Sequence, residues 1–355
     1  MAARFIHKPS ATSYIRNYGN AAGWGYTGGK VYVNGDGVAR AMAMGFNFGQ
    51  SWFVDGDETD TTLDGKDPGN PLTTIAAAIS AASDRDVIFI APRKIVGTAT
   101  DPVNYAENVV IPAAKRLALI GAGWGGPAQG GQPQIKKGTG SDPQITIRSA
   151  GCLIAGLSIN GGDATGGGIL LDDDGGTSKN AFGTTIDSCF FKNCRGSSAT
   201  DGRLGGAIQW PAAGGSWQVR ITNNRFYKNL ADIVMKGTGT SVPQDVVIQG
   251  NVFSSPAASV DVNIYVAADG IGGLIIDSNL FPVLPAGGGT LSRFYSLATG
   301  CLGIISNNRF GSTALTFGGT NTGGAHPATM FLSANYQQAA VAQDAANGAR
   351  IGYTA

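Results

Sequence analysis

A short phrase recurs along most of this chain, and its period constrains the fold more than any other feature. The phrase reads Ile-x-x-Asn-x-Phe, with Cys189 in place of Asn in one copy, and its clear copies begin at Ile186, Ile221, Ile248, Ile276 and Ile305. Weaker copies begin at Ile154 and Leu332, so successive copies lie 27 to 35 residues apart. A unit of this length cannot bury its apolar side chains alone, so neighbouring copies must stack on one another.

Stacking places equivalent residues of successive copies over each other. We expect Ile and Phe to point inward from two short strands, with Asn turning the chain between them, because Asn tolerates left-handed backbone. The predicted stacked core consists of Ile186, Ile221, Ile248, Ile276, Ile305, Phe191, Phe226, Phe253, Phe281 and Phe310. The predicted internal ladder, in which each side-chain amide bonds to the next, consists of Asn224, Asn251, Asn279, Asn308 and Asn335.

Two other repeat architectures fit less well. Leucine-rich repeats need a recurring Leu-x-x-Leu-x-Leu frame, which the chain lacks, and propeller blades run longer, at about 40–50 residues. The sequence therefore predicts an all-β, single-stranded parallel β-helix of about nine coils, stacked at the usual strand spacing.

Composition shifts divide the chain into three parts. Residues 1–48 form an extended N-terminal arm, in which neither helical nor strand periodicity persists. Residues 49–335 form the β-helix rod, with a short helix near 73–83 capped by Thr73 or Thr74. Residues 336–355 form a tail with a short helix at roughly 337–346.

The arm carries aromatic surface without a core of its own. Two interpretations stay open: the arm docks on a partner protein, which we favour, or it packs on its own domain. We expect the docking contacts to involve Phe5, Tyr14, Tyr18, Trp24 and Tyr26.

Charge and cysteine usage narrow the function classes. The chain has 25 basic and 24 acidic residues, and this balance offers no excess for a nucleic-acid backbone. No apolar run reaches the roughly 18 residues of a membrane span, and the first residues lack the apolar stretch of a standard signal peptide. The four cysteines form no Cys-x-x-Cys pair, so we expect buried thiols in a reducing compartment and no metal site.

The stretch 52–123 resembles the entry of right-handed β-helix proteins of the pectin-lyase-like superfamily. The matching segments are 53–56, 64–65, 71–75, 86–92 and 119–123, which read FVDG, DG, PLTTI, DVIFIAP and LIGAG. The resemblance covers roughly residues 50–335 and implies a right-handed coil whose short helix caps the open N-terminal end. The superfamily holds lyases, hydrolases, phage tailspikes and other virion surface proteins, so the resemblance implies no single activity.

Catalytic candidates are few. Polygalacturonase-like hydrolases use a Gly-His-Gly segment, and neither His7 nor His326 lies in one. Pectate-lyase-like enzymes use Ca²⁺ on carboxylates with a basic residue, and the nearest match is Asp172 and Asp174 with Arg195. The Asp-rich segment also suits an ordinary turn, which we favour. No cofactor is expected, with Ca²⁺ as the alternative, either here or in the acidic loop 55–67.

Three tryptophans have two interpretations. Trp124, Trp210 and Trp217 can stack on sugar rings, or they can pack under turns or at a subunit interface, which we favour.

A rod without a recognisable catalytic set, joined to an aromatic arm, predicts a structural bacteriophage virion protein. We expect a capsid decoration or short spike, made in the host cytoplasm, that attaches through residues 1–48 to the major capsid or tail protein. Resemblance to tailspikes implies a homotrimer, with the exposed tip contacting host surface polysaccharide. Two alternatives remain: a polysaccharide lyase or glycoside hydrolase acting as a depolymerase, and a carbohydrate-binding module.

Overall fold

The computed structural model describes most of the chain from residue 49 to residue 338. Within that range it leaves out 98–101, 124–130, 137–139, 163–165, 173–180, 196–205, 212–214, 237–241, 268, 288–290, 313–314 and 319–322. Outside it, the structure describes the strands β1 (Gly23–Thr27), β2 (Lys30–Asn34) and β29 (Ala349–Arg350). In this part of the chain, no helix is long and apolar enough to cross a membrane.

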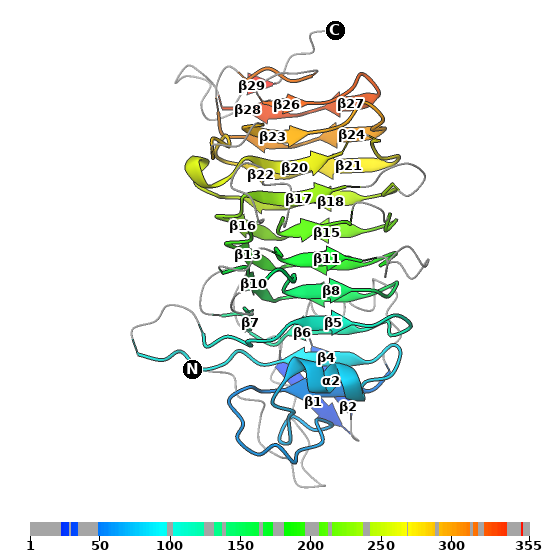
Figure 1. Ribbon diagram of the computed structural model, residues 1–355, viewed down its shortest axis with the longest axis vertical. Coiled ribbons are helices and arrows are strands. Elements are labelled where there is room, and N and C mark those ends of the chain that lie inside the picture. Colours follow the sequence, from blue (N-terminus) through cyan, green and yellow to red (C-terminus); the bar gives the residue numbers. More distant parts are fainter. Residues whose placement is uncertain are drawn as a thin grey trace.

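Three sheets run along one rod (Figure 1). Sheet 1 holds β3 (Ser51–Val54), β4 (Val87–Ile90), β6 (Ala118–Gly121), β9 (Leu153–Ala155), β12 (Thr185–Asp187), β15 (Arg220–Thr222), β18 (Val247–Gln249), β21 (Leu274–Asp277), β24 (Gly303–Ser306) and β27 (Met330–Ser333). Sheet 2 holds β7 (Gln134–Ile135), β10 (Ser158–Asn160), β13 (Phe190–Lys192), β16 (Arg225–Tyr227), β19 (Val252–Phe253), β22 (Leu280–Phe281), β25 (Arg309–Phe310) and β28 (Tyr336–Gln337), with β29 at its end. Sheet 3 holds β5 (Val109–Ile111), β8 (Ile145–Ile147), β11 (Ile169–Leu171), β14 (Ile208–Gln209), β17 (Ala231–Met235), β20 (Val262–Val266), β23 (Arg293–Ser296) and β26 (Gly324–Ala325).

The chain visits sheets 1, 2 and 3 in turn, and each strand of the rod pairs in parallel with its equivalent one coil away. The predicted parallel β-helix is therefore confirmed. Seven described coils contribute a strand to all three sheets, from β6–β7–β8 to β24–β25–β26, which is fewer than the nine expected. The incomplete coils lie at both ends of the rod. A long turn segment and a helix follow β3 in place of strands of sheets 2 and 3, and the β4–β5 coil has only an isolated bridge at Tyr105 in place of a sheet 2 strand. The β27–β28 coil has no described strand in sheet 3.

The repeated Ile and Phe form the centre of the rod. Ile186, Ile221, Ile248, Ile276 and Ile305 lie in register on sheet 1, each paired with the next. Phe191, Phe226, Phe253, Phe281 and Phe310 stack with ring centroids 4.6–5.1 Å apart and interplanar angles of 4–11°. All ten side chains are buried, so each coil uses the apolar surface of its neighbours as its core.

The repeated Asn forms a hydrogen-bonded ladder inside the corner between sheets 1 and 2. The Oδ1 of Asn251 accepts from the backbone N–H of Asn224 at 2.9 Å and from its Nδ2 at 3.1 Å, and Asn224 Nδ2 also donates to the carbonyl of Ile186. The same pattern continues through Asn279 and Asn308 to Asn335. Each buried amide thus has its polar atoms satisfied, as low-dielectric surroundings require.

The left-handed turn lies one residue earlier than the sequence suggested. Positive φ occurs at Asn223, Gly250, Ser278, Asn307 and Ala334, each directly before a ladder Asn. The ladder Asn itself must direct both its N–H and its amide along the rod, so the preceding residue makes the bend.

The short helix α2 spans Ile75–Ala81, within the predicted range, and lies at the N-terminal end of the rod (Figure 1). Thr74 Oγ1 accepts from the N–H of Ala77 at 3.2 Å, which is an N-cap. The carboxylate of Glu107 accepts from the free N–H groups of Ile75 and Ala76. Ile75, Ala78 and Ile79 are buried against the first coils.

Both predicted end segments differ in part from the structure. Trp24 and Tyr26 lie in β1, which pairs antiparallel with β2 so that Thr27 lies opposite Lys30, whereas no strand was expected there. Gly28-Gly29 between two alternating stretches is the hairpin signal. Phe5, Tyr14 and Tyr18 lie outside the described residues. At the other end, Gln337 is part of β28 and not of a helix, because β28 continues the sheet 2 ladder; 339–348 are outside the described residues.

Candidate binding groove

The outer face of sheet 1 changes character along the rod. Residues just before each inward Ile point outward, and strand pairing aligns them in one column: Ala118, Leu153, Thr185, Arg220, Val247, Ile275, Ile304 and Phe331. The column is apolar at first, polar at Thr185 and Arg220, and apolar again from Val247 onward. We call Val247, Ile275, Ile304 and Phe331 the outer stripe.

A hollow of about 870 Å³ lies along this column between β12 and β24. Its floor is formed by outward side chains of sheet 1, and its wall by the corner that leads from sheet 3 into sheet 1. The lining residues are Gly183, Thr185, Gln218, Arg220, Thr222, Asp245, Val247, Gly273, Ile275, Gly303 and Ile304. We call this hollow the groove.

The groove combines an aliphatic floor with a few polar groups. Among the described residues that line it, Asp245 is the one carboxylate and Arg220 the one basic side chain, and both are exposed. Glycines form part of the wall: Gly273 has φ +71°, and a Cβ there would collide with the Asp245 carboxylate. Glycine at this corner therefore keeps the groove open and sets the position of Asp245.

Exposed aromatic side chains stand near both ends of the groove. Trp217, next to the lining residue Gln218, is 40% exposed; its Nε1 donates to the carbonyl of Val242 at 3.0 Å, and its ring lies against Phe182 at 5.5 Å. Phe331, which pairs with the lining residue Ile304, is 61% exposed. Trp217 is thus held in place while its ring faces solvent.

The other tryptophans differ from Trp217. Trp210 is fully buried, and its Nε1 donates to the carbonyl of Ser216 at 3.1 Å, so it packs in the core and offers no stacking surface. Trp124 lies outside the described residues.

The predicted catalytic residues lie away from this groove. Asp172 follows β11 at the corner between sheets 3 and 1, where its carboxylate accepts from Arg148 Nε at 2.7 Å. Arg195 is exposed and follows β13, at the corner between sheets 2 and 3. The two residues therefore occupy different corners of successive coils, and Asp174 lies outside the described residues. The sequence indicates that Asp172 and Arg195 lie about one coil apart, but it does not show at which corner of its coil each residue lies.

Two carboxylates on the other outer column of sheet 1 are used structurally. Asp277 accepts from Ser306 Oγ, Asn307 Nδ2, Gln249 Nε2 and Ser278 Oγ at 2.7–2.9 Å. Partial burial opposes ionisation, but these four donors outweigh it and lower the pKa of Asp277 to about 2. Asp187 forms the equivalent contacts with Thr222, Asn223 and Ser188. Both acids thus tie one coil to the next.

The acidic loop 55–67 is likewise occupied by turn contacts. Asp57 accepts from Arg93 Nε at 3.1 Å and from the N–H of Lys94 at 2.5 Å, and Asp55 and Asp60 accept from N–H groups two residues on. In the described part of the chain, no group of three or more His, Cys, Asp or Glu is arranged to hold a metal ion. All four cysteines are buried, and burial raises the pKa of Cys152, Cys189 and Cys194 to about 12.

The sequence contained a signal for the groove that the search for catalytic motifs missed. The residue directly before each repeated Ile defines its floor, so reading the repeat one position outward gives Thr185, Arg220, Val247, Ile275 and Ile304. None of these residues is unusual by itself, and only the alignment of five repeats makes them one surface.

Comparison with known proteins assigns no activity to this chain. No protein-family model matches the chain, and no curated protein matches it. Similar solved structures include the pectate lyase Pel9A (8% identity, 82% of this chain and 80% of that chain, TM-score 0.39) and the pectin methylesterase PemA from Erwinia chrysanthemi (13%, 82% and 91%, TM-score 0.38). A third is PfbA, a surface adhesin of Streptococcus pneumoniae (13%, 74% and 86%, TM-score 0.32). This protein is a parallel β-helix whose structural neighbours include both polysaccharide-active enzymes and an adhesin.

Proposed function

We propose that this protein is a structural rod that binds a glycan chain along the groove and does not cleave it. The observation that carries the proposal is the groove itself: an elongated hollow with exposed aromatic rings near both ends and a single described carboxylate. Glycoside hydrolysis generally needs two carboxylates about 5–9 Å apart, one on each side of the scissile bond. A Ca²⁺-dependent lyase site needs several oxygen ligands, for which one carboxylate is too few.

The groove offers the contacts that a sugar chain uses. The apolar faces of sugar rings can stack on Trp217 and Phe331, while sugar hydroxyls can accept hydrogen bonds from Arg220. The floor between them is aliphatic, and the β-helix holds it rigid, so little conformational entropy is lost on binding.

We further propose that the rod belongs to a bacteriophage particle, as a short spike or capsid decoration that is made in the host cytoplasm. The features that support this setting are the distinct composition of residues 1–48 and the low share of charged residues, at 14%. In this proposal residues 1–48 anchor the protein to the capsid or tail, three copies associate, and the groove contacts host surface polysaccharide.

The binding proposal is tested with the full chain on an array of bacterial surface polysaccharides, followed by calorimetry on any binder. We expect binding without release of new reducing ends or unsaturated products, and a loss of about tenfold in affinity for Trp217→Ala. The matched control is Tyr336→Ala, which removes an equally exposed aromatic ring from β28 on sheet 2, away from the groove. Retained affinity in Trp217→Ala would remove the groove from the proposal.

The depolymerase alternative remains because Arg220 and Asp245 line the same groove and could serve as a base and an acid. Cleavage of a bound polysaccharide that disappears in Arg220→Ala or in Asp245→Asn would establish that alternative. The particle setting is tested separately by native mass spectrometry and by antibody labelling of phage particles. A monomer that labels no particle would contradict it.

A further inference from the structure

A second apolar surface lies on the outer face of sheet 1, at the N-terminal end of the rod. Trp52, Val54, Ile88 and Leu119 face the main core, and the residues that alternate with them face outward. These outward residues form a cluster separate from the main core, which we call the outer cluster: Phe53, Val87, Phe89, Ala118 and Leu153.

The outer cluster is buried although it faces away from the core. Phe53 is 1% exposed and Phe89 is 4%, and their rings stack with centroids 5.6 Å apart. Neighbouring strands cover only the flanks of an outward side chain, and Ile275, which also lies between two strands, is 37% exposed. Additional chain must therefore lie over the outer cluster.

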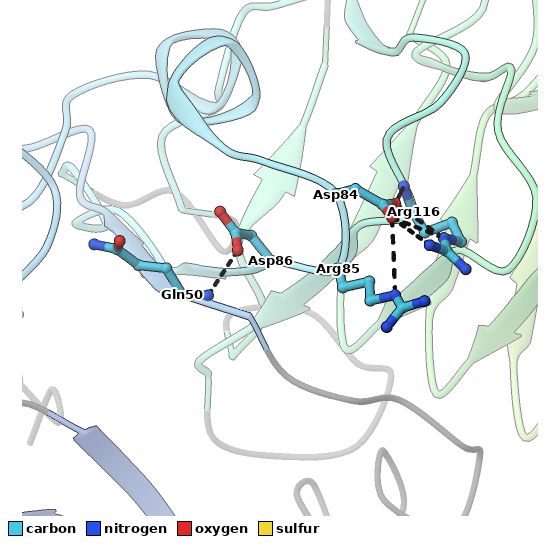
Figure 2. A network of polar contacts seen from close by, with 5 residues as sticks. All are labelled: Gln50, Asp84, Arg85, Asp86 and Arg116. Carbon is cyan, nitrogen blue, oxygen red and sulfur yellow. Dashed lines mark hydrogen bonds and ion pairs between the residues drawn. The ribbon is translucent and has the colours of Figure 1, made fainter.

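The point at which residues 1–48 join the rod lies beside this cluster. Gly49 N–H donates to the carbonyl of Arg85 at 2.7 Å. Figure 2 shows the next contact, in which Gln50 N–H donates to Asp86 Oδ1 at 2.6 Å. Asp86 Oδ2 also accepts from Trp52 Nε1 at 2.8 Å, and a Cβ at residue 49 would collide with Asp86. The chain is thus fixed at the start of β3, three residues before Phe53.

We propose that residues 1–48 fold back over the outer face of β3, β4, β6 and β9, and that their aromatic side chains cover the outer cluster. The segment contains Phe5, Tyr14, Tyr18, Trp24 and Tyr26, and two of these residues, Trp24 and Tyr26, belong to β1 of the β1–β2 hairpin. Apolar surface on both sides supplies the driving force, since each would otherwise stay in water.

The boundary of the outer cluster supports this occupant. The outward residues of the next strand, β12, are Thr185 and Asp187, so the apolar surface ends after four strands. A segment that starts at β3 can cover four strands, which span about 15–20 Å at the usual spacing. The inference does not depend on glycan binding, and it refines the anchoring proposal: the part of the arm that packs on the rod cannot also contact a capsid.

The test places the photo-crosslinking residue p-benzoylphenylalanine at Phe89 in the full chain. After irradiation, mass spectrometry identifies the peptide that has been joined to residue 89. We expect peptides from residues 1–48 of the same chain, shown to be intramolecular by an unchanged mass on denaturing gels. The same replacement at Phe53 provides a second site, in case the first variant does not fold.

The matched control carries the same crosslinker at Phe331, which has the same outward direction but is exposed. There we expect no product with residues 1–48. A product between residue 89 and 124–130, a product with a second copy, or no product at all would each overturn the proposal, because each assigns the outer cluster a different cover or none.

Discussion

The outer face of sheet 1 carries apolar side chains at both ends of the rod, and the two ends differ in exposure. At the N-terminal end, Phe53 and Phe89 are almost fully buried, whereas at the C-terminal end Ile275 and Phe331 are 37% and 61% exposed. Strand direction, pairing and residue class are the same in both places. The comparison shows that strand register decides which way a side chain points, while a separate segment of chain or a ligand decides whether it meets water.

The largest expected difference between the two ends is in the stability that is lost when an aromatic side chain is removed. Phe89→Ala should lower the free energy of unfolding by about 3–5 kcal/mol, because it leaves a cavity beside Phe53. Phe331→Ala should change it by less than about 0.5 kcal/mol, as exposed positions usually do. Denaturant unfolding of both variants measures the difference, and equal losses would show that the outer cluster is not a packed surface.

The sequence predicts those structural features whose residues repeat from coil to coil, and it does not predict the others. The stacked Ile and Phe and the Asn ladder were predicted because each coil uses the same residue at the same place. The groove was not, because Thr185, Arg220 and Val247 are chemically unlike each other and become one surface only through register. The cover that we propose for the outer cluster is a contact between distant segments, and no local pattern in residues 1–48 specifies it.

A smaller, sharper difference is expected from one pair of valines in sheet 1. Val87 is fully buried in the outer cluster and Val247 is half-buried in the outer stripe. Threonine has nearly the shape of valine but adds a hydroxyl, which costs about 1–3 kcal/mol where it finds no partner. We expect that loss for Val87→Thr and less than about 0.5 kcal/mol for Val247→Thr, measured by thermal unfolding. Equal shifts in Tm would mean that the outer cluster and the outer stripe are equally exposed to solvent.

The smallest expected effect is the response to acid, which should differ between the two ends. Asp277 lies beside the outer stripe, and its hydrogen bonds lower its pKa to about 2, whereas the equivalent positions in the first strands are Phe53, Phe89 and Ile120. A lowered pKa in the folded state means that the contribution of Asp277 to stability is present above about pH 4 and is lost as the pH falls toward 2. Solvent screening at this partly exposed site limits the loss to roughly 1 kcal/mol.

Hydrogen exchange at pH 6 and pH 2.5, corrected for the intrinsic rate at each pH, locates this effect along the rod. We expect reduced protection in β21 and β24 at the lower pH and little change in β3 and β4, and Asp277→Asn should remove most of the pH dependence in β21 and β24. The physical reason is that the side-chain amide of Asn at residue 277 can still accept hydrogen bonds from Ser306 and Asn307. Unlike the Asp277 carboxylate, this amide does not titrate between pH 2 and pH 4. Acid sensitivity that appears first in β3 and β4 would instead indicate that the cover of the outer cluster, and not the Asp277 network, is the pH-dependent contact.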